Sequence, residues 1–123
     1  MKLINKDVHE HCCSLELLQL LYDKGMRYRE WGEGTLTYNS LAEKKFNEGD
    51  VSYLKDTVTH QIVLEWLRVN HGIWISVSLD LSNTQLFDFE IQKEHWLHLE
   101  TGLYDTPQEA TEVGIMYVLN NLI

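Results

Sequence analysis

The densest group of potential ligands in the sequence is the stretch His9-Glu10-His11-Cys12-Cys13, written HEHCC. Imidazoles and thiolates are the ligands that zinc prefers, and a carboxylate can join them. A structural zinc site usually takes its four ligands from two close pairs separated by a longer spacer, and the sequence lacks that spacing. We therefore expect no metal site. The weak candidates for one are His9, His11, Cys12 and Cys13.

Thiol chemistry is the second possibility at the same place. Cys13 directly precedes Ser14, a residue type that often caps a helix, and a thiol at a helix N-terminus can have its pKa lowered by the helix dipole. His11 lies nearby in the sequence and could serve as a base. No oxyanion or base-orienting motif accompanies the pair, and cysteines outside disulfides often serve as small buried apolar residues. We expect no catalytic residue here, with Cys13 and His11 as weak candidates.

The remaining signatures of common enzymes are missing from the sequence. It contains no glycine-rich phosphate loop, no GxSxG and no HExxH. The paired carboxylates Asp88 and Glu90 could do acid and base work only in a cleft that separates their pKa values, so a solvated sheet face is the simpler interpretation. We expect a protein that is not an enzyme and that needs no cofactor.

Charge is distributed unevenly along the 123 residues. The chain holds 19 acidic and 10 basic residues, a net charge of -9, and residues 69 to 123 hold eight acidic residues against the single base Lys93, a net charge of -7. Such a field repels phosphate groups, so direct binding to nucleic acid or to an anionic membrane is not expected.

These groups must be positioned by elements that the sequence pattern indicates, and a chain of this length suits a single domain over 1–123. A leucine-rich helix is predicted from Leu15 to Lys24, capped by Ser14 and ended by Gly25. Residues 26–38 suggest a short hairpin. Residues 39–56 are predicted to be an irregular connection that contains a short helix at 41–46 and a turn at 48–50.

The carboxyl half has clearer periodicity. Apolar residues at three and four residue spacing predict a helix over 59–70, and strict alternation predicts strands over 73–79 and 86–92, with a third over 96–100. Thr106, Pro107 and Glu109 form a capping box that opens a helix over 107–121. The predicted fold class is therefore α+β, a small antiparallel sheet of about three to five strands packed by two or three helices, in the order helix, strand, strand, strand, helix.

Two surfaces could contact a partner. On the sheet, Trp74 lies opposite the aliphatic row of its strand and Trp96 could share its face, unless the helix at 15–24 covers them. The helix over 107–121 is apolar nearly all round and must be covered on more than one side, for which a homodimer is one solution. The residues expected on these interaction surfaces are Trp74, Trp96, Asp88, Glu90, Ile115, Met116 and Val118.

Two resemblances accompany these patterns. The order helix, three strands, helix is similar to that of a double-stranded RNA-binding domain, but the second helix opens Pro107-Gln108-Glu109 without that family's lysine cluster, so that function is not expected. The stretches CSLELLQLLYDKG, THQIVLEWLRVNHGIWI and YDTPQEATEVGIMYVLNNLI resemble small uncharacterised proteins of bacterial phages and mobile elements. The second resemblance implies a cytoplasmic α+β protein whose biochemistry is not established.

Localisation and function follow as expectations. No apolar run approaches the roughly 20 residues that cross a bilayer, and the amino terminus lacks the apolar core of a signal peptide, so we expect a cytoplasmic protein. The predicted function is a non-enzymatic protein-protein interaction module with an unknown protein partner. It could inhibit a host nucleic-acid-binding protein by imitating phosphates with its acidic half. The alternative is a small thiol-dependent enzyme or ligand binder that uses Cys13 and His11.

Overall fold

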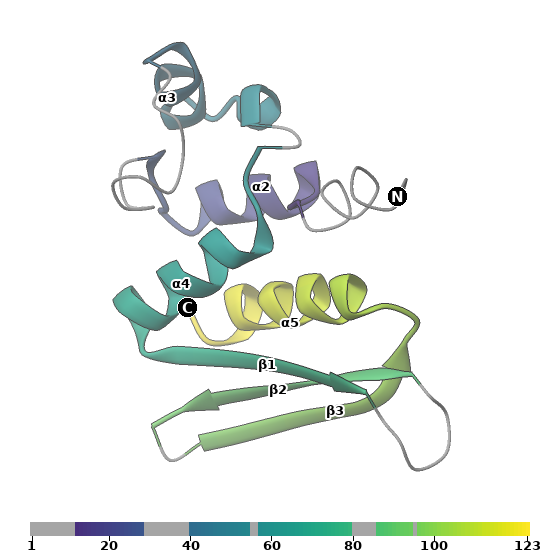
Figure 1. The fold of residues 1–123 in the computed structure, drawn as a ribbon. Helices are drawn as coiled ribbons and strands as arrows, with labels where there is room; N and C mark the ends of the chain where they lie inside the picture. Colours follow the sequence, from purple (N-terminus) through teal and green to yellow (C-terminus); the bar gives the residue numbers. More distant parts are fainter. Residues whose placement is uncertain (1–11, 29–39, 55–56, 80–85, 95) are drawn as a thin grey trace. The chain divides into compact units, whose positions relative to one another are not determined.

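The chain forms two compact units in the computed structural model, Met1–Val63 and Leu64–Ile123 (Figure 1). The structure describes residues 12–28, 40–54, 57–79, 86–94 and 96–123, with the backbone alone at residues 96 and 99–103. The predicted single domain over 1–123 stays a prediction. Within the described ranges, no helix has the length and apolar character that crossing a membrane requires.

Helix α2 (Leu15–Asp23) of the first unit begins where the sequence predicts and ends one residue before the predicted Lys24, which is its C-cap. The Ser14 hydroxyl accepts a hydrogen bond from the backbone N–H of Leu17 at 3.1 Å, which satisfies one of the amide groups that a helix start leaves unpaired. Gly25 follows the helix with a φ of 91°, a conformation that favours glycine, and its N–H donates to the carbonyl of Tyr22 at 3.0 Å.

Regular structure occupies much of the segment 39–56, which the sequence analysis predicted to be an irregular connection. Helix α3 covers Ser40–Asn47 and a 3₁₀ turn, η2, covers Val51–Leu54. The reason is one apolar pair: Ala42 and Phe46 are four residues apart, lie on one helix face and are both buried. The short helix predicted at 41–46 lies within α3, whereas η2 occupies residues that were predicted to be irregular, and the prediction is wrong for that element. The predicted turn at 48–50 is present.

The second unit contains an antiparallel sheet of strands β1 (Ile73–Leu79), β2 (Phe87–Lys93) and β3 (Trp96–Tyr104), in that spatial order. Helix α4 (His60–His71) precedes the sheet, and helix α5 (Pro107–Asn121) follows it. The carboxyl half therefore runs helix, strand, strand, strand, helix, and the α+β class is confirmed. The predicted hairpin within 26–38 falls largely outside the described residues.

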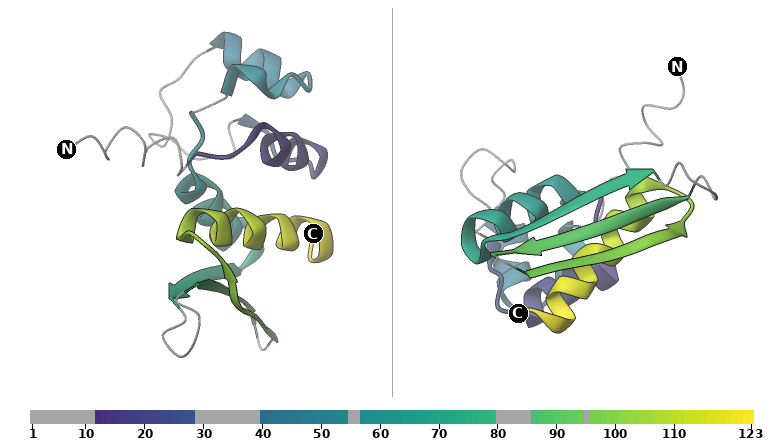
Figure 2. Two further views of the ribbon diagram at one scale, coloured as in Figure 1. Left: turned by 90° about the vertical axis from the view of Figure 1, so that its right-hand side faces the viewer. Right: turned by 90° about the horizontal axis from the view of Figure 1, so that it is seen from below.

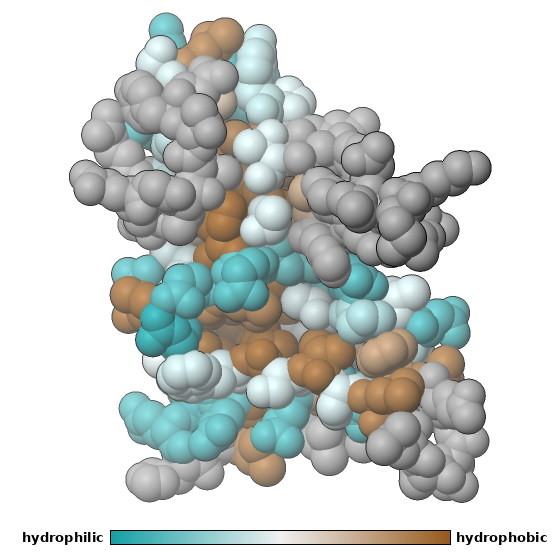
Figure 3. All heavy atoms as spheres, in the orientation of Figure 1, coloured by the Kyte–Doolittle hydropathy of each residue, from teal (hydrophilic) through white to brown (hydrophobic). Residues whose placement is uncertain are grey.

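Helix α5 packs closely on one face of the sheet. Its N-cap is Thr106, whose hydroxyl accepts a hydrogen bond from the backbone N–H of Glu109 at 3.1 Å. A Cβ atom added at Gly114 would lie 3.3 Å from side-chain carbons of Ile75 and of Phe89, so only glycine allows this approach without displacement. Hydrophobic atoms gather in the layer between α5 and β1 (Figure 3).

An aromatic cluster completes this packed layer. The His98 and Tyr117 rings stack with their centroids 4.4 Å apart, and Phe89 lies near both, at 6.3 Å and 6.5 Å. Tyr104 adds a fourth ring 5.9 Å from Phe89. Offset and tilted ring contacts at these distances stabilise a core beyond the area that they bury.

The close approach at Gly114 predicts a sensitive position. We expect Gly114→Leu to lower the free energy of unfolding by about 2 kcal/mol or more, because the new side chain must displace Ile75 and Phe89 in a packed layer. Asn120→Leu, at an exposed position of the same helix, should change it by less than about 0.5 kcal/mol. Urea unfolding followed by near-ultraviolet circular dichroism measures both. Equal stabilities of the two variants would contradict the packing described for α5.

Candidate functional site

The face of the sheet that α5 does not cover carries the most distinctive surface of the second unit. Alternation along each strand places Ile75 and Phe89 under α5 and their neighbours on the other side. No described helix of residues 64–123 lies against that side, which faces the viewer in the right panel of Figure 2. The pairing register aligns its positions in three rows, Trp74–Gln92–Leu97, Ser76–Glu90–Leu99 and Ser78–Asp88.

Two large apolar side chains are exposed in the first of these rows. The exposed fraction is 55% for Trp74 and 60% for Leu97, and Gln92 is the only residue between them in the row. A single exposed apolar residue is ordinary, but two in one row of an uncovered sheet form a patch that a partner can bury. We call the residues Trp74, Ser76, Glu90, Gln92 and Leu97 the open face.

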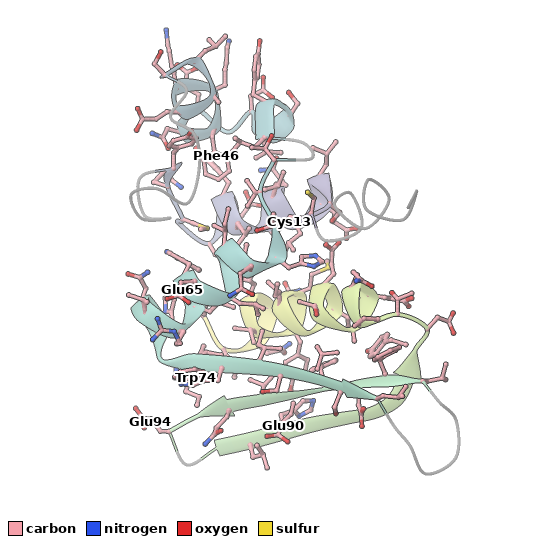
Figure 4. All side chains as sticks on the ribbon, viewed as in Figure 1. Cys13, Phe46, Glu65, Trp74, Glu90 and Glu94 are labelled. Atoms are coloured by element: carbon pink, nitrogen blue, oxygen red, sulfur yellow. The ribbon has the colours of Figure 1, made fainter. Side chains whose placement is uncertain are left out.

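A shallow hollow of about 410 Å³ lies at one end of the open face, lined by Trp74, Ser76, Gln92 and Glu94. Trp74 and Glu94 lie at the same end of the sheet, and Glu90 lies further along it (Figure 4). Glu94 follows β2 with a φ of 53°, and it is the only residue other than glycine with a positive φ in the described ranges. The hollow thus combines an aromatic wall with three polar side chains.

Helix α4 supplies a cation to the same tryptophan. The guanidinium carbon of Arg68 lies 5.3 Å from the centre of the Trp74 ring, within the range of a cation–π contact. Arg68 also donates a hydrogen bond to the Glu65 carboxylate, and this bond raises the pKa of Arg68. The guanidinium is therefore charged throughout the neutral range, and it holds the indole from one side.

The two carboxylates predicted for the sheet surface differ in exposure. Glu90 is partly exposed, whereas Asp88 keeps only 9% of its surface. The Ser78 hydroxyl donates a hydrogen bond to Asp88 at 3.4 Å. Asp88 also lies where the pairing of β2 with β3 is irregular. Of the pair, only Glu90 offers a carboxylate to a partner.

Trp96 does not share the row of Trp74. The register pairs Trp96 with Lys93, which in turn pairs with Ile73, a position on the side that α5 covers. Leu97 takes the place that the sequence analysis gave to Trp96. The sequence signal for this placement is the length of the turn between β2 and β3. Two residues lie between Lys93 and Trp96, and this turn length determines which residues of β3 lie on each face of the sheet.

The three residues predicted as a contact surface on the last helix are mostly inside the chain. Ile115 and Val118 are fully buried, and only Met116 is partly exposed. An apolar helix needs cover on several sides, and the cover that these two side chains need is already present within one chain. Ile115 and Val118 therefore belong to the core and not to the predicted interaction surface.

The cysteines lie in the first unit and are both buried thiols. Cys13 is 4% exposed and its backbone N–H donates to the carbonyl of Val58 at 2.8 Å, while Cys12 pairs with Thr59 in an isolated bridge. His9 and His11 lie outside the described residues. Across the part of the chain that the structure describes, no three His, Cys, Asp or Glu side chains gather as metal ligands would.

Comparisons with known proteins add no assignment, since no protein-family model, no curated protein and no solved structure matches the chain. The site rests on the chain's own geometry. Sequence reasoning identified Trp74 and Glu90 but missed Arg68, Leu97 and the polar residues of the hollow. Gln92 and Leu97 follow from the strand register, whereas the contact of Arg68 with Trp74 depends on the path of the chain around Gly72, for which the sequence has no periodic signal.

Burial of both cysteines predicts slow thiol chemistry. A disulfide reagent such as dithionitrobenzoate should modify Cys12 and Cys13 at least about tenfold more slowly in the native chain than in urea, because reaction requires local opening. The absorbance of the released thiolate follows both rates. Fast modification of the native protein at pH 6 would contradict this description, since it requires an exposed thiol of lowered pKa.

Proposed function

We propose that the chain is a non-enzymatic protein-binding module and that the open face of its sheet is the contact surface. The observation that carries this proposal is the exposure of Trp74 and Leu97 in one row of a sheet face that α5 does not cover. Tryptophan is among the residues that contribute most to binding when a partner buries it, and polar neighbours form the rim of such a surface. Ser76, Gln92 and Glu90 are such neighbours.

The charge of the chain favours a basic partner. Glu90 lies on the open face and Glu94 lies at its end, and the whole chain carries a net charge of -9. Two copies of the chain would bring like charges together at this surface, and phosphate groups would be repelled. A protein with arginine and lysine side chains around an apolar contact fits both the charge and the apolar row. Nucleic-acid-binding proteins present basic surfaces of this kind, so inhibition of a host protein of that class belongs to this proposal.

Imitation of a phosphate backbone is less well supported than ordinary protein docking. Such imitation needs a continuous acidic surface, but Glu90 is the single acidic residue of the open face, and Gln92 separates it from Glu94. Glu109 belongs to α5, on the other side of the sheet, and the Glu65 carboxylate is engaged by Arg68. The partner is therefore expected to bury apolar surface at the centre and to meet carboxylates at the edge.

The other predicted roles have weaker support. A thiol-dependent enzyme or ligand binder would need Cys13 within reach of a substrate, and its burial opposes this. A homodimer through the helix over 107–121 would have to use Met116 and other partly exposed residues, because Ile115 and Val118 are buried. Neither role uses the exposed row on the sheet.

The proposal predicts which substitutions abolish binding. A protein that the full chain captures from a bacterial lysate is identified, purified and titrated against the chain by calorimetry. We expect Trp74→Ser with Leu97→Ser to weaken this binding at least about thirtyfold, which corresponds to the roughly 2 kcal/mol typical of residues that dominate an interface. The affinity should also fall as salt is added, because complementary charges are screened.

A matched control exists in the first unit. Leu41 and Tyr53 are exposed to similar extents, 50% and 49%, so Leu41→Ser with Tyr53→Ser removes a comparable apolar surface elsewhere. This control should change the affinity by less than about threefold. Equal losses for the two double variants, or no loss for the sheet variant while its circular dichroism stays native, would contradict the proposed contact surface.

A further inference from the structure

We propose that the hollow at the end of the open face is a receptor for one arginine side chain of the partner, held between the Trp74 ring and the Glu94 carboxylate. This inference rests on the proposed function, because it names the chemical group that the same surface recognises. It depends on three features of the hollow: unengaged acceptors, an accessible aromatic wall and a net negative field.

The acceptors come from three neighbouring positions. Ser76 lies on β1, Gln92 lies on the adjacent strand β2, and Glu94 lies two residues beyond Gln92. All three side chains are exposed and line the hollow. Within the described ranges, none of them makes a hydrogen bond or an ion pair. They provide a hydroxyl oxygen, an amide oxygen and two carboxylate oxygens to a donor that enters the hollow.

The aromatic wall is already shown to suit a guanidinium. Arg68 approaches the Trp74 ring at 5.3 Å, yet Trp74 as a residue is still 55% exposed. A second planar cation can therefore contact the exposed part of Trp74 without displacing Arg68. Tryptophan is the best of the aromatic side chains for such contacts, and arginine forms them more often than lysine does.

The local charges favour a cation in this place. Glu90 and Glu94 are negative, and the positive charge of Arg68 is balanced by Glu65, with which it forms an ion pair. Lys93 pairs with Ile73 and so belongs to the side of the sheet that α5 covers. Among the described residues around the hollow, an incoming cation thus meets more negative than positive charge.

These features select arginine over lysine. A guanidinium is planar, presents five donors in a fixed fork and is weakly hydrated, so it can stack on the indole while its N–H groups reach acceptors in several directions. An ammonium group is a compact and strongly hydrated charge that cannot stack. A group of hydrogen-bond acceptors beside an exposed aromatic ring therefore binds arginine better than lysine.

Titration of the ¹⁵N-labelled full chain with N-acetyl-arginine methylamide tests the assignment by nuclear magnetic resonance. We expect saturable shifts at the indole N–H of Trp74 and the backbone N–H of Gln92, with dissociation constants in the millimolar range or weaker for so small a probe. The citrulline analogue, which has nearly the same shape but no charge, and the lysine analogue should bind at least about threefold more weakly.

Substitution of Glu94 tests whether its carboxylate contributes to binding of the arginine. Glu94→Gln keeps the size of the side chain and should weaken the arginine probe about two- to fivefold, the range for an exposed ion pair. Glu109→Gln, an exposed carboxylate on α5, is the matched control and should leave the affinity unchanged.

The assignment would be overturned by the absence of shifts at Trp74, by equal binding of the arginine and citrulline probes, by equal binding of the arginine and lysine probes, or by an unchanged affinity in Glu94→Gln. Such a failure is separable from a failure of the proposed function. A partner protein that loses binding to the Trp74 and Leu97 double variant but is insensitive to Glu94→Gln would leave the open face as a contact surface and remove only the arginine receptor.

Discussion

The contact between helix α5 and the sheet at Gly114 is the constraint on which the second unit depends. A Cβ atom added at Gly114 would lie 3.3 Å from side-chain carbons of Ile75 and Phe89. Glycine therefore lets the helix backbone approach the sheet closely at this position. The close approach lets a single helix bury the centre of one sheet face. Among the described residues of 64–123, no second helix covers the opposite face of the sheet.

The character of that second face follows from how its residues are held. A solvated sheet face normally carries polar side chains, and Ser76, Ser78 and Gln92 follow this rule. Trp74 and Leu97 do not, and Arg68 with its partner Glu65 orients the indole. Exposed apolar side chains that lie together and are rimmed by polar residues mark interaction sites, and this is the physical basis for the proposed contact surface.

Local signals in the sequence were sufficient for much of the fold. The caps at Ser14 and Thr106 and the alternation over 73–79 predicted elements that the structure contains, because each depends on neighbours within four residues. The short helix predicted at 41–46 lies within α3, where Ala42 and Phe46 mark the buried side, whereas the 3₁₀ turn η2 was not predicted. The candidate site was harder still: the presence of Leu97 in the row of Trp74 depends on pairing between strands, which no single segment encodes.

The proposed contact requires that the Trp74 face of the sheet is open in the isolated chain and available to a partner. Paramagnetic broadening by a soluble gadolinium chelate measures this directly, with the buried Trp66 of the same molecule as an internal reference. We expect the indole ring protons of Trp74 to broaden strongly in dilute protein while those of Trp66 are protected. Equal protection of the two indoles would show that the face is already covered and would contradict an open Trp74 face.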